Sequence, residues 1–216
     1  ANGGYKVQPY LIDRIESRDG QPLFIANPAS VPQNSPQSID DQDLPNTINA
    51  AANATSIEPT AAERIIDERT AFILTNMLQD VIKRGTGRRA LAMGRSDLAG
   101  KTGTTNESKD SWFSGYNADY TTTVWSGFDQ PESLGRMEFG GTVALPIWMN
   151  YMSAALKDKP AHLLPEPAGI LTLRVDPITG RAASPGNANA YFELFKSEDS
   201  PPSMGELDPS QSTLGS

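Results

Sequence analysis

Residues 98–105 read Leu-Ala-Gly-Lys-Thr-Gly-Thr-Thr, a run in which small residues and hydroxyls surround a single lysine. In a strand, alternation places the side chains of Thr102 and Thr104 on one face and that of Lys101 on the other. Gly103 lies inside this strand, and such a glycine usually marks a place where a ligand or another backbone comes close. The stretch therefore predicts a strand edge that offers N–H groups, hydroxyls and one positive charge to an anionic, carbonyl-bearing ligand.

The sequence around this strand predicts an antiparallel sheet packed with helices, an α+β fold. Asp67 is expected to cap a helix that runs to about Arg84, because apolar residues recur there at helical spacing. Residues 111–116 and 120–128 predict two further strands, which would form a meander with the lysine strand. Residues 140–157 predict a last helix, which Pro146 is expected to kink.

The remaining segments predict a main domain at residues 1–158 with additions. Within it, residues 5–25 predict a β-hairpin that turns at Asp19-Gly20, and the Pro-rich residues 26–63 predict a surface excursion. Residues 159–182 predict a C-terminal strand and turn, and residues 183–216 a mostly disordered acidic tail. Four apolar residues of this tail predict a docking segment: Tyr191, Phe192, Leu194 and Phe195.

The composition excludes several classes of function. A net charge of −8 over 216 residues and a pI near 4.7 argue against binding of nucleic acid or an anionic membrane. The chain has no cysteine, and its single histidine, His162, argues against a Ser-His-Asp site and a multi-histidine metal site. No metal or other cofactor is therefore expected. No apolar run approaches the roughly 18 residues that a membrane helix needs.

A phosphate-binding P-loop is the first reading to test, because Gly100-Lys101-Thr102 resembles the end of one. The P-loop pattern requires a glycine at position 95. That position holds Arg95, and the nearest glycine is Gly94. A P-loop also leads into a helix, whereas Gly103 and two threonines follow here. Both spacing and context exclude this reading.

Lys-Thr-Gly at residues 101–103 is instead a signature shared by penicillin-binding proteins and class A β-lactamases, alongside Ser-x-x-Lys and a Ser-x-Asn-type triplet. The flanking sequence closely resembles the transpeptidase domain of class A penicillin-binding proteins, and together the stretches look like the 1a type of Gram-negative bacteria. The resemblance covers about residues 1–182. The matching stretches are residues 1–5 (ANGGY), 84–87 (RGTG), 97–106 (DLAGKTGTTN), 110–116 (DSWFSGY), 124–129 (VWSGFD), 134–136 (LGR) and 140–148 (GGTVALPIW).

This resemblance implies a serine DD-transpeptidase that cross-links peptidoglycan stem peptides and is acylated by β-lactam antibiotics. It implies that Lys101 supplies positive potential and helps proton transfer. The hydroxyls of Thr102 and Thr104 would bind the donor's terminal carboxylate, and the N–H of Thr104 would form half of the oxyanion hole. Gly103 would let the substrate lie along the strand, and Thr105 would complete the substrate-binding stretch.

Two signatures of the family are absent from this chain: no serine begins a Ser-x-x-Lys motif, and no Ser-x-Asn triplet occurs. In the family both precede the stretch at residues 1–5, as do a glycosyltransferase domain and a membrane anchor. The upstream part of the same enzyme is therefore expected to carry the nucleophile, and this chain alone is expected to be inactive. The resemblance places this segment in the periplasm, at the inner membrane.

Two other readings stay open: a serine β-lactamase-like hydrolase, which shares the lysine strand, and a non-catalytic module that only binds peptide. Residues 85–89 are read as a flexible basic loop, either a solvated turn or a rim that meets an acidic partner. The three tryptophans, Trp112, Trp125 and Trp148, are expected in the core rather than at a ligand.

Overall fold

The computed structural model describes residues 1–32 and 60–202. The chain forms two compact units, one spanning Asn2–Ile66 and the other Asp67–Ser216 together with Ala1. The main domain predicted at residues 1–158 crosses this division.

The unit at Asn2–Ile66 contains the predicted hairpin, with β1 at Arg14–Glu16 and β2 at Pro22–Ile25. Gly20 has a positive φ of 80°, as a turn glycine should. The strands are shorter than the sequence suggests, since a two-stranded ribbon alone buries little apolar surface. Three predicted strand formers lie outside the strands and are about half exposed: Val7, Tyr10 and Ile12. Most of the predicted excursion, residues 33–59, lies outside the described residues.

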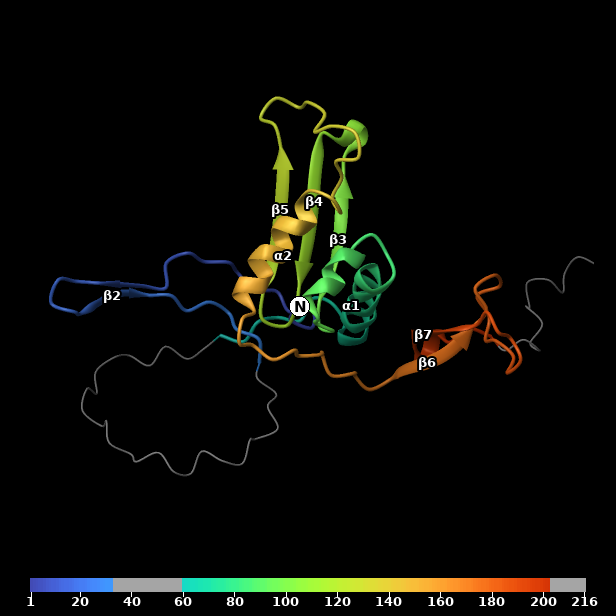
Figure 1. Ribbon diagram of the computed structural model, residues 1–216. Coiled ribbons are helices and arrows are strands. Elements are labelled where there is room, and N and C mark those ends of the chain that lie inside the picture. Colours follow the sequence, from blue (N-terminus) through green and yellow to red (C-terminus); the bar gives the residue numbers. More distant parts are fainter. Residues whose placement is uncertain (33–59, 203–216) are drawn as a thin grey trace, which may run out of the picture. The chain divides into compact units, whose positions relative to one another are not determined.

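The second unit is built on the predicted meander (Figure 1). It consists of β3 (Ala99–Thr104), β4 (Asp110–Tyr116) and β5 (Thr121–Gly127), which pair antiparallel in that order. The lysine stretch therefore forms a strand, as predicted, and this strand lies at one edge of the sheet. The antiparallel sheet with its helices confirms the α+β fold class.

Two α-helices accompany the sheet: α1 at Glu68–Lys83 and α2 at Ala144–Ala155. Asp67 caps α1 as predicted, since its carboxylate accepts a 3.1 Å hydrogen bond from the N–H of Thr70. The second helix begins later than expected, so Pro146 falls in its first turn, where no intrahelical N–H bond is lost. Short 3-10 helices lie at Arg88–Met93, Asn106–Ser108 and Ser197–Asp199.

One face of the sheet carries the core. Along β4, Ser111, Phe113 and Gly115 are buried and alternate with more exposed residues. The rings of Phe113 and Trp148 are fully buried and meet edge to face, with centroids 4.9 Å apart. The buried apolar cluster joins α2, α1 and the sheet: Ile82, Ala90, Leu98, Phe113, Ala144, Leu145, Trp148, Met152 and Leu156.

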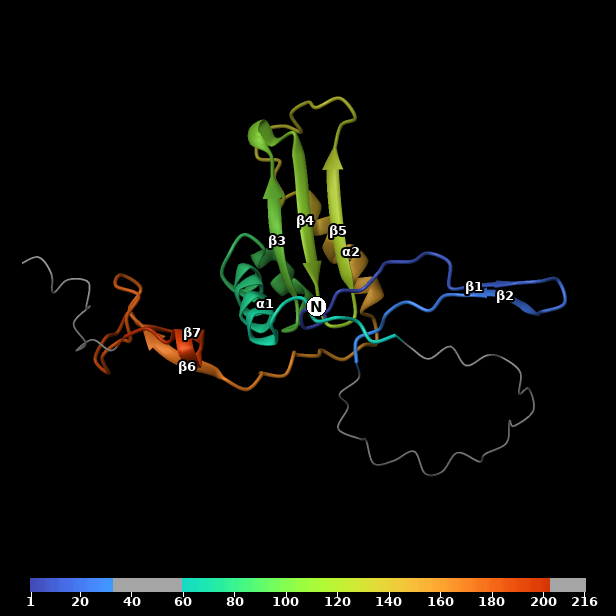
Figure 2. The same ribbon diagram turned by 180° about the vertical axis from the view of Figure 1, so that it is seen from behind.

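The opposite face of the sheet, the one turned away from α2 in Figure 2, is more exposed along β4. Trp112 and Trp125 pair across β4 and β5, with ring centroids 6.1 Å apart, and remain 40% and 46% exposed. The prediction of a core position is confirmed for Trp148 and wrong for these two. Strand alternation explains the difference, because it directs them away from Phe113.

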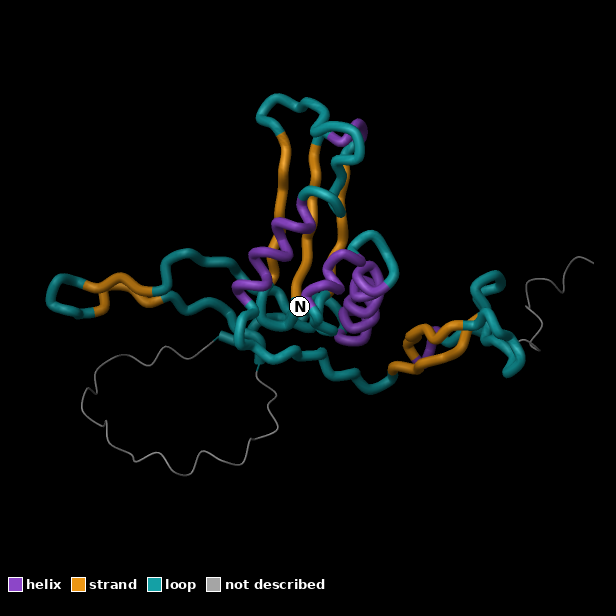
Figure 3. The backbone as a smooth tube through the Cα atoms, viewed as in Figure 1, coloured by secondary structure: helices purple, strands orange, loops and turns teal. Residues whose placement is uncertain are grey.

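A second hairpin follows, with β6 at Ile170–Val175 and β7 at Tyr191–Lys196 (Figure 3). The first of these strands was predicted. Tyr191–Lys196 contain the four apolar residues that were set apart from the predicted disordered tail, and they pair residue by residue with β6. Two ion pairs connect this end of the chain to the start of α1, Arg69–Glu198 at 2.8 Å and Lys196–Asp67 at 3.3 Å. Residues 203–216 lie outside the described residues.

Candidate functional site

The ammonium group of Lys101 lies at the edge of β3. Lys101 pairs with Ser114 and Thr102 with Phe113, so their side chains leave the strand on opposite faces, as predicted. The long lysine side chain nevertheless bends around the edge. Its Nζ donates to the backbone carbonyl of Thr102 at 2.9 Å and to the Thr102 hydroxyl at 3.4 Å. A positive charge and a hydroxyl from opposite faces thus meet at one place.

The hydroxyl of Thr102 has a second neighbour in the loop that follows α1. Its Oγ1 lies 2.7 Å from the Oγ1 of Thr86, a hydrogen bond in which either atom could donate. Thr86 belongs to the loop that the sequence favours as a solvated turn. The loop is exposed at Gly85, Thr86, Arg88 and Arg89, as a solvated turn should be, and it also holds a direct contact with the predicted site.

The hydroxyl of Thr104 is held from another loop, the one that leads into α2. The N–H of Gly140 donates to Thr104 Oγ1 at 3.0 Å. A Cβ at position 140 would lie 2.4 Å from the carbonyl oxygen of Trp112 and 2.7 Å from that of Gly103. Only glycine lets the backbone at position 140 come this close to β3 and β4, and the close contact holds the loop against these two strands.

Gly103 and Thr105 occupy distinct positions along the same strand end. A Cβ on Gly103 would come within 3.1 Å of the Trp112 Cβ, so the glycine keeps that surface open. The hydroxyl of Thr105 accepts from the N–H of Asp110 at 2.8 Å and donates to its carboxylate at 3.2 Å. It closes the turn between β3 and β4. A substrate-binding role for either residue remains a prediction.

The start of β3 is anchored by a buried carboxylate. Asp97 is 4% exposed and receives two hydrogen bonds from the guanidinium of Arg95, at 2.9 and 2.7 Å. It also accepts from the amide of Asn117 at 3.1 Å and from the N–H of His162 at 3.2 Å. Burial alone would raise the pKa of Asp97, but these hydrogen bonds and the Arg95 charge outweigh it and lower the pKa. The single histidine of the chain, His162, thus contributes to this hydrogen-bond network through its backbone N–H.

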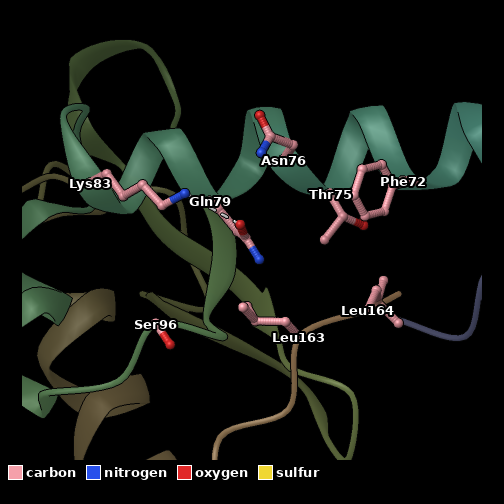
Figure 4. A pocket seen from close by; sticks show the side chains of 8 residues that line it. All are labelled: Phe72, Thr75, Asn76, Gln79, Lys83, Ser96, Leu163 and Leu164. Atoms are coloured by element: carbon pink, nitrogen blue, oxygen red, sulfur yellow. Dashed lines mark hydrogen bonds between the residues drawn. The ribbon is translucent and has the colours of Figure 1, made fainter. Parts of the chain in front are cut away.

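A separate hollow of about 300 Å³ lies beside α1 (Figure 4). The side chains of Asn76, Gln79 and Lys83 line it from the helix, and Leu163 and Leu164 from the segment after α2. Lys83 donates to the amide oxygen of Gln79 at 3.4 Å. The hollow contains none of the five predicted site residues, so it is distinct from the edge of β3.

The family of this chain follows from its match to known sequences. The penicillin binding protein transpeptidase domain matches residues 1–153, a segment that includes the whole β3–β4–β5 sheet. The chain belongs to the penicillin-binding protein transpeptidase family. The resemblance inferred from the sequence is thereby confirmed.

Individual relatives agree with this assignment. Penicillin-binding protein 1A of Pseudomonas aeruginosa is 62% identical over 97% of this chain, and penicillin-binding protein 1A of Neisseria meningitidis is 41% identical over 80%. The crystal structure of penicillin-binding protein 1A from Haemophilus influenzae covers 95% of this chain with a TM-score of 0.77 and 34% identity. The chain spans 28%, 18% and 31% of these proteins, respectively.

Sequence reasoning found the strand of this transpeptidase-family chain but missed two neighbours, Thr86 and Gly140. Both lie in stretches that match the family; Thr86 stands between two glycines and Gly140 is followed by a third glycine, Gly141, which was the available signal. Among the described residues, no group of three or more His, Asp or Glu side chains is placed to bind a metal ion. The helices in the described ranges also include none with the length and apolar character of a membrane span.

Proposed function

We propose that this chain is the C-terminal part of a serine-type D-Ala-D-Ala transpeptidase that cross-links peptidoglycan stem peptides. The observation that carries the proposal is the meeting of the Lys101 ammonium with the Thr102 hydroxyl at the edge of β3. An ammonium beside hydroxyl donors suits a carboxylate, since charge-assisted hydrogen bonds are stronger than neutral ones. The donor stem peptide ends in such a carboxylate, and β-lactams carry one at a similar place.

The reaction is an acyl transfer in two steps. The nucleophilic serine attacks the carbonyl of the penultimate D-alanine, forms an ester and releases the terminal D-alanine, whose nitrogen takes up a proton. An amine of a neighbouring strand then attacks the ester and forms the cross-linking amide, and a proton that this amine loses restores the hydroxyl of the departing serine. The N–H of Thr104 stabilises the tetrahedral oxyanion together with the N–H of the nucleophile, and loss of one such donor costs about 3–4 kcal/mol.

Lys101 acts in this reaction through its charge and its proton. Its ammonium attracts the anionic end of the donor and assists proton transfer near the reacting hydroxyl. Thr102 and Thr104 orient the carboxylate, which holds the scissile carbonyl in place. Gly103 leaves space along the strand, so that the peptide can lie beside it.

The nucleophile belongs, in this proposal, to a segment that precedes residue 1 in the complete enzyme. The chain contains no Ser-x-x-Lys motif, and it spans 28% of its Pseudomonas aeruginosa relative. The sheet face that carries Lys101, Trp112 and Trp125 offers a surface for such a segment, because both indole rings remain substantially exposed. The enzyme then acts at the periplasmic side of the inner membrane, held by an upstream anchor.

Fluorescent penicillin tests this function. The enzyme can be completed by joining this chain to the upstream part of the Pseudomonas aeruginosa relative. We expect stoichiometric covalent labelling that persists for many minutes, because a transpeptidase hydrolyses the acyl-enzyme slowly. Rapid turnover of the penicillin would instead indicate a β-lactamase-like hydrolase. Absence of any covalent adduct in the folded, completed enzyme would leave only a peptide-binding module.

A further inference from the structure

We propose that Thr86 is a positioning residue that sets the direction of the Thr102 hydroxyl proton for carboxylate binding. The inference rests on the proposed function, in which Thr102 binds a carboxylate. Thr86 lies in the loop after α1, sixteen residues from Thr102 in sequence, and their hydroxyl oxygens are 2.7 Å apart.

The hydrogen-bonding capacity of a hydroxyl group limits which partners Thr102 can have at one time. Thr102 Oγ1 carries one proton and two acceptor positions. The ammonium of Lys101, 3.4 Å away, can only donate, so it takes one acceptor position. The contact with Thr86 then uses either the remaining acceptor position or the proton.

An anion decides between these two arrangements. If Thr102 donated to Thr86, a carboxylate would face a lone pair instead of a proton. If Thr86 donates, both acceptor positions of Thr102 are filled and its proton is free for the anion. A hydroxyl that accepts while it donates is also the stronger donor, because successive hydrogen bonds polarise one another. A bound carboxylate therefore selects donation from Thr86 to Thr102.

The loop is built to hold Thr86 in place. The N–H groups of Gly85 and Gly87 on either side both donate to the carbonyl of Val81, at 3.1 and 2.9 Å. A Cβ on Gly85 would lie 2.8 Å from the Val81 Cα, so the turn closes this tightly only with glycine. The backbone of Thr86 is thereby fixed to the end of α1, and its hydroxyl stays directed at Thr102.

Thr104 shows the same arrangement with a donor of fixed direction. Its Oγ1 accepts from the N–H of Gly140 at 3.0 Å, which leaves its proton for another partner. Both threonine hydroxyls of the strand are therefore hydrogen-bonded to a loop outside the sheet. At Thr104 the loop partner is a backbone N–H, which can only donate. The Thr86 hydroxyl occupies the corresponding position at Thr102, and this parallel supports donation by Thr86.

Acylation kinetics of the completed enzyme test the inference. Thr86→Val replaces the hydroxyl by a methyl group of similar size, and we expect about fivefold slower acylation by benzylpenicillin. Thr86→Ser keeps the hydroxyl and should restore most of the rate. Benzylpenicillin methyl ester lacks the carboxylate, so its acylation rate should be the same with Thr86→Val as with the parent enzyme. Thr172→Val, an exposed threonine of β6, is the matched control and should change neither rate.

A double-mutant comparison separates positioning from a general structural effect. Thr102→Val alone should slow acylation by benzylpenicillin about 30-fold, and adding Thr86→Val should slow it no further, since Thr86 acts through Thr102. Equal slowing of acylation by the acid and by the ester, or a full fivefold effect in the Thr102→Val background, would overturn the inference.

Should Thr86→Val lower the melting temperature, Thr86→Ala is used in its place under the same criteria, provided that it keeps the parent's melting temperature. If Thr102→Val slows acylation but neither Thr86→Val nor Thr86→Ala does, the inference fails and the proposed function stands. If the parent enzyme is not acylated at all, the proposed function fails with it.

Discussion

The N–H of Gly140 donates a 3.0 Å hydrogen bond to the hydroxyl of Thr104, thirty-six residues away in the sequence. The contact joins the loop before α2 to the edge strand of the sheet. The neighbouring hydroxyl of Ser111 accepts from the N–H of Ala144 at 3.2 Å, so the first turn of α2 is tied to the sheet as well. The end of β3 is thus positioned by the helix that covers the core.

Gly140→Ala should displace this loop. The new Cβ would meet the carbonyl oxygens of Trp112 and Gly103 at 2.4 and 2.7 Å, which is closer than nonbonded atoms approach. We expect at least tenfold slower acylation of the completed enzyme by penicillin and a lower melting temperature. Gly186→Ala is the control, because a Cβ there meets nothing within 4 Å. Normal kinetics for Gly140→Ala would show that the loop does not position Thr104.

Lys101→Ala should slow acylation of the completed enzyme by about 100-fold or more, because both the charge and the assisted proton transfer are lost. Its side chain is exposed, so the melting temperature should change little. Lys109→Ala removes a nearby lysine that pairs with Glu107 at 2.8 Å and should leave the rate unchanged. Stopped-flow acylation with a chromogenic cephalosporin measures both variants. An unaltered rate for Lys101→Ala would remove its assigned role.

Asp97→Asn should destabilise the chain by about 3 kcal/mol at pH 7, since it leaves the guanidinium of Arg95, whose side chain is only 14% exposed, without its counter-charge. The pKa of Asp97 is lowered in the folded chain from its ordinary value of 3.8. Its stabilising contribution is therefore complete above that value and is lost as the pH falls through the lower, folded pKa. Urea unfolding at pH 7 and near pH 3 should show that the difference in free energy of unfolding between Asp97→Asn and the parent is smaller at the lower pH. A gap that widens in acid would contradict this role.

Trp148→Ala should lower the free energy of unfolding by about 3–5 kcal/mol, because the indole ring is fully buried against Phe113. Trp125→Ala, at a ring that is 46% exposed, should cost only about 1 kcal/mol in the chain. Urea unfolding followed by circular dichroism compares the two. Equal losses of unfolding free energy in the two variants would mean that Trp148 and Trp125 contribute equally to stability, contrary to their different burial.

Local patterns were sufficient to predict α1 and the three-stranded meander. The bounds of α1 were predicted to within a residue because Asp67 is a good cap and an apolar stripe runs from there to Ile82. The meander followed from short strands separated by polar turns. The pairing of β7 with β6 was missed, since a Ser- and Pro-rich context hides a strand whose partner begins about twenty residues earlier.

The parts of the site that the sequence did not predict depend on contacts between loops. Thr86 and Gly140 reach β3 from sixteen and thirty-six residues away, and a single threonine or glycine has no periodicity that would predict such a contact. The exposure of Trp112 and Trp125 was missed for a related reason. A large aromatic residue indicates burial on average, whereas only the register of the strands determines which face it occupies.

Mass-spectrometric mapping of the penicillin adduct tests the central claim most directly. The chain alone and the completed enzyme are each incubated with benzylpenicillin, digested and searched for the acylated serine. The account predicts no adduct on the chain alone and one adduct on a serine upstream of residue 1 in the completed enzyme. A stoichiometric adduct on any serine of the 216-residue chain itself would contradict it.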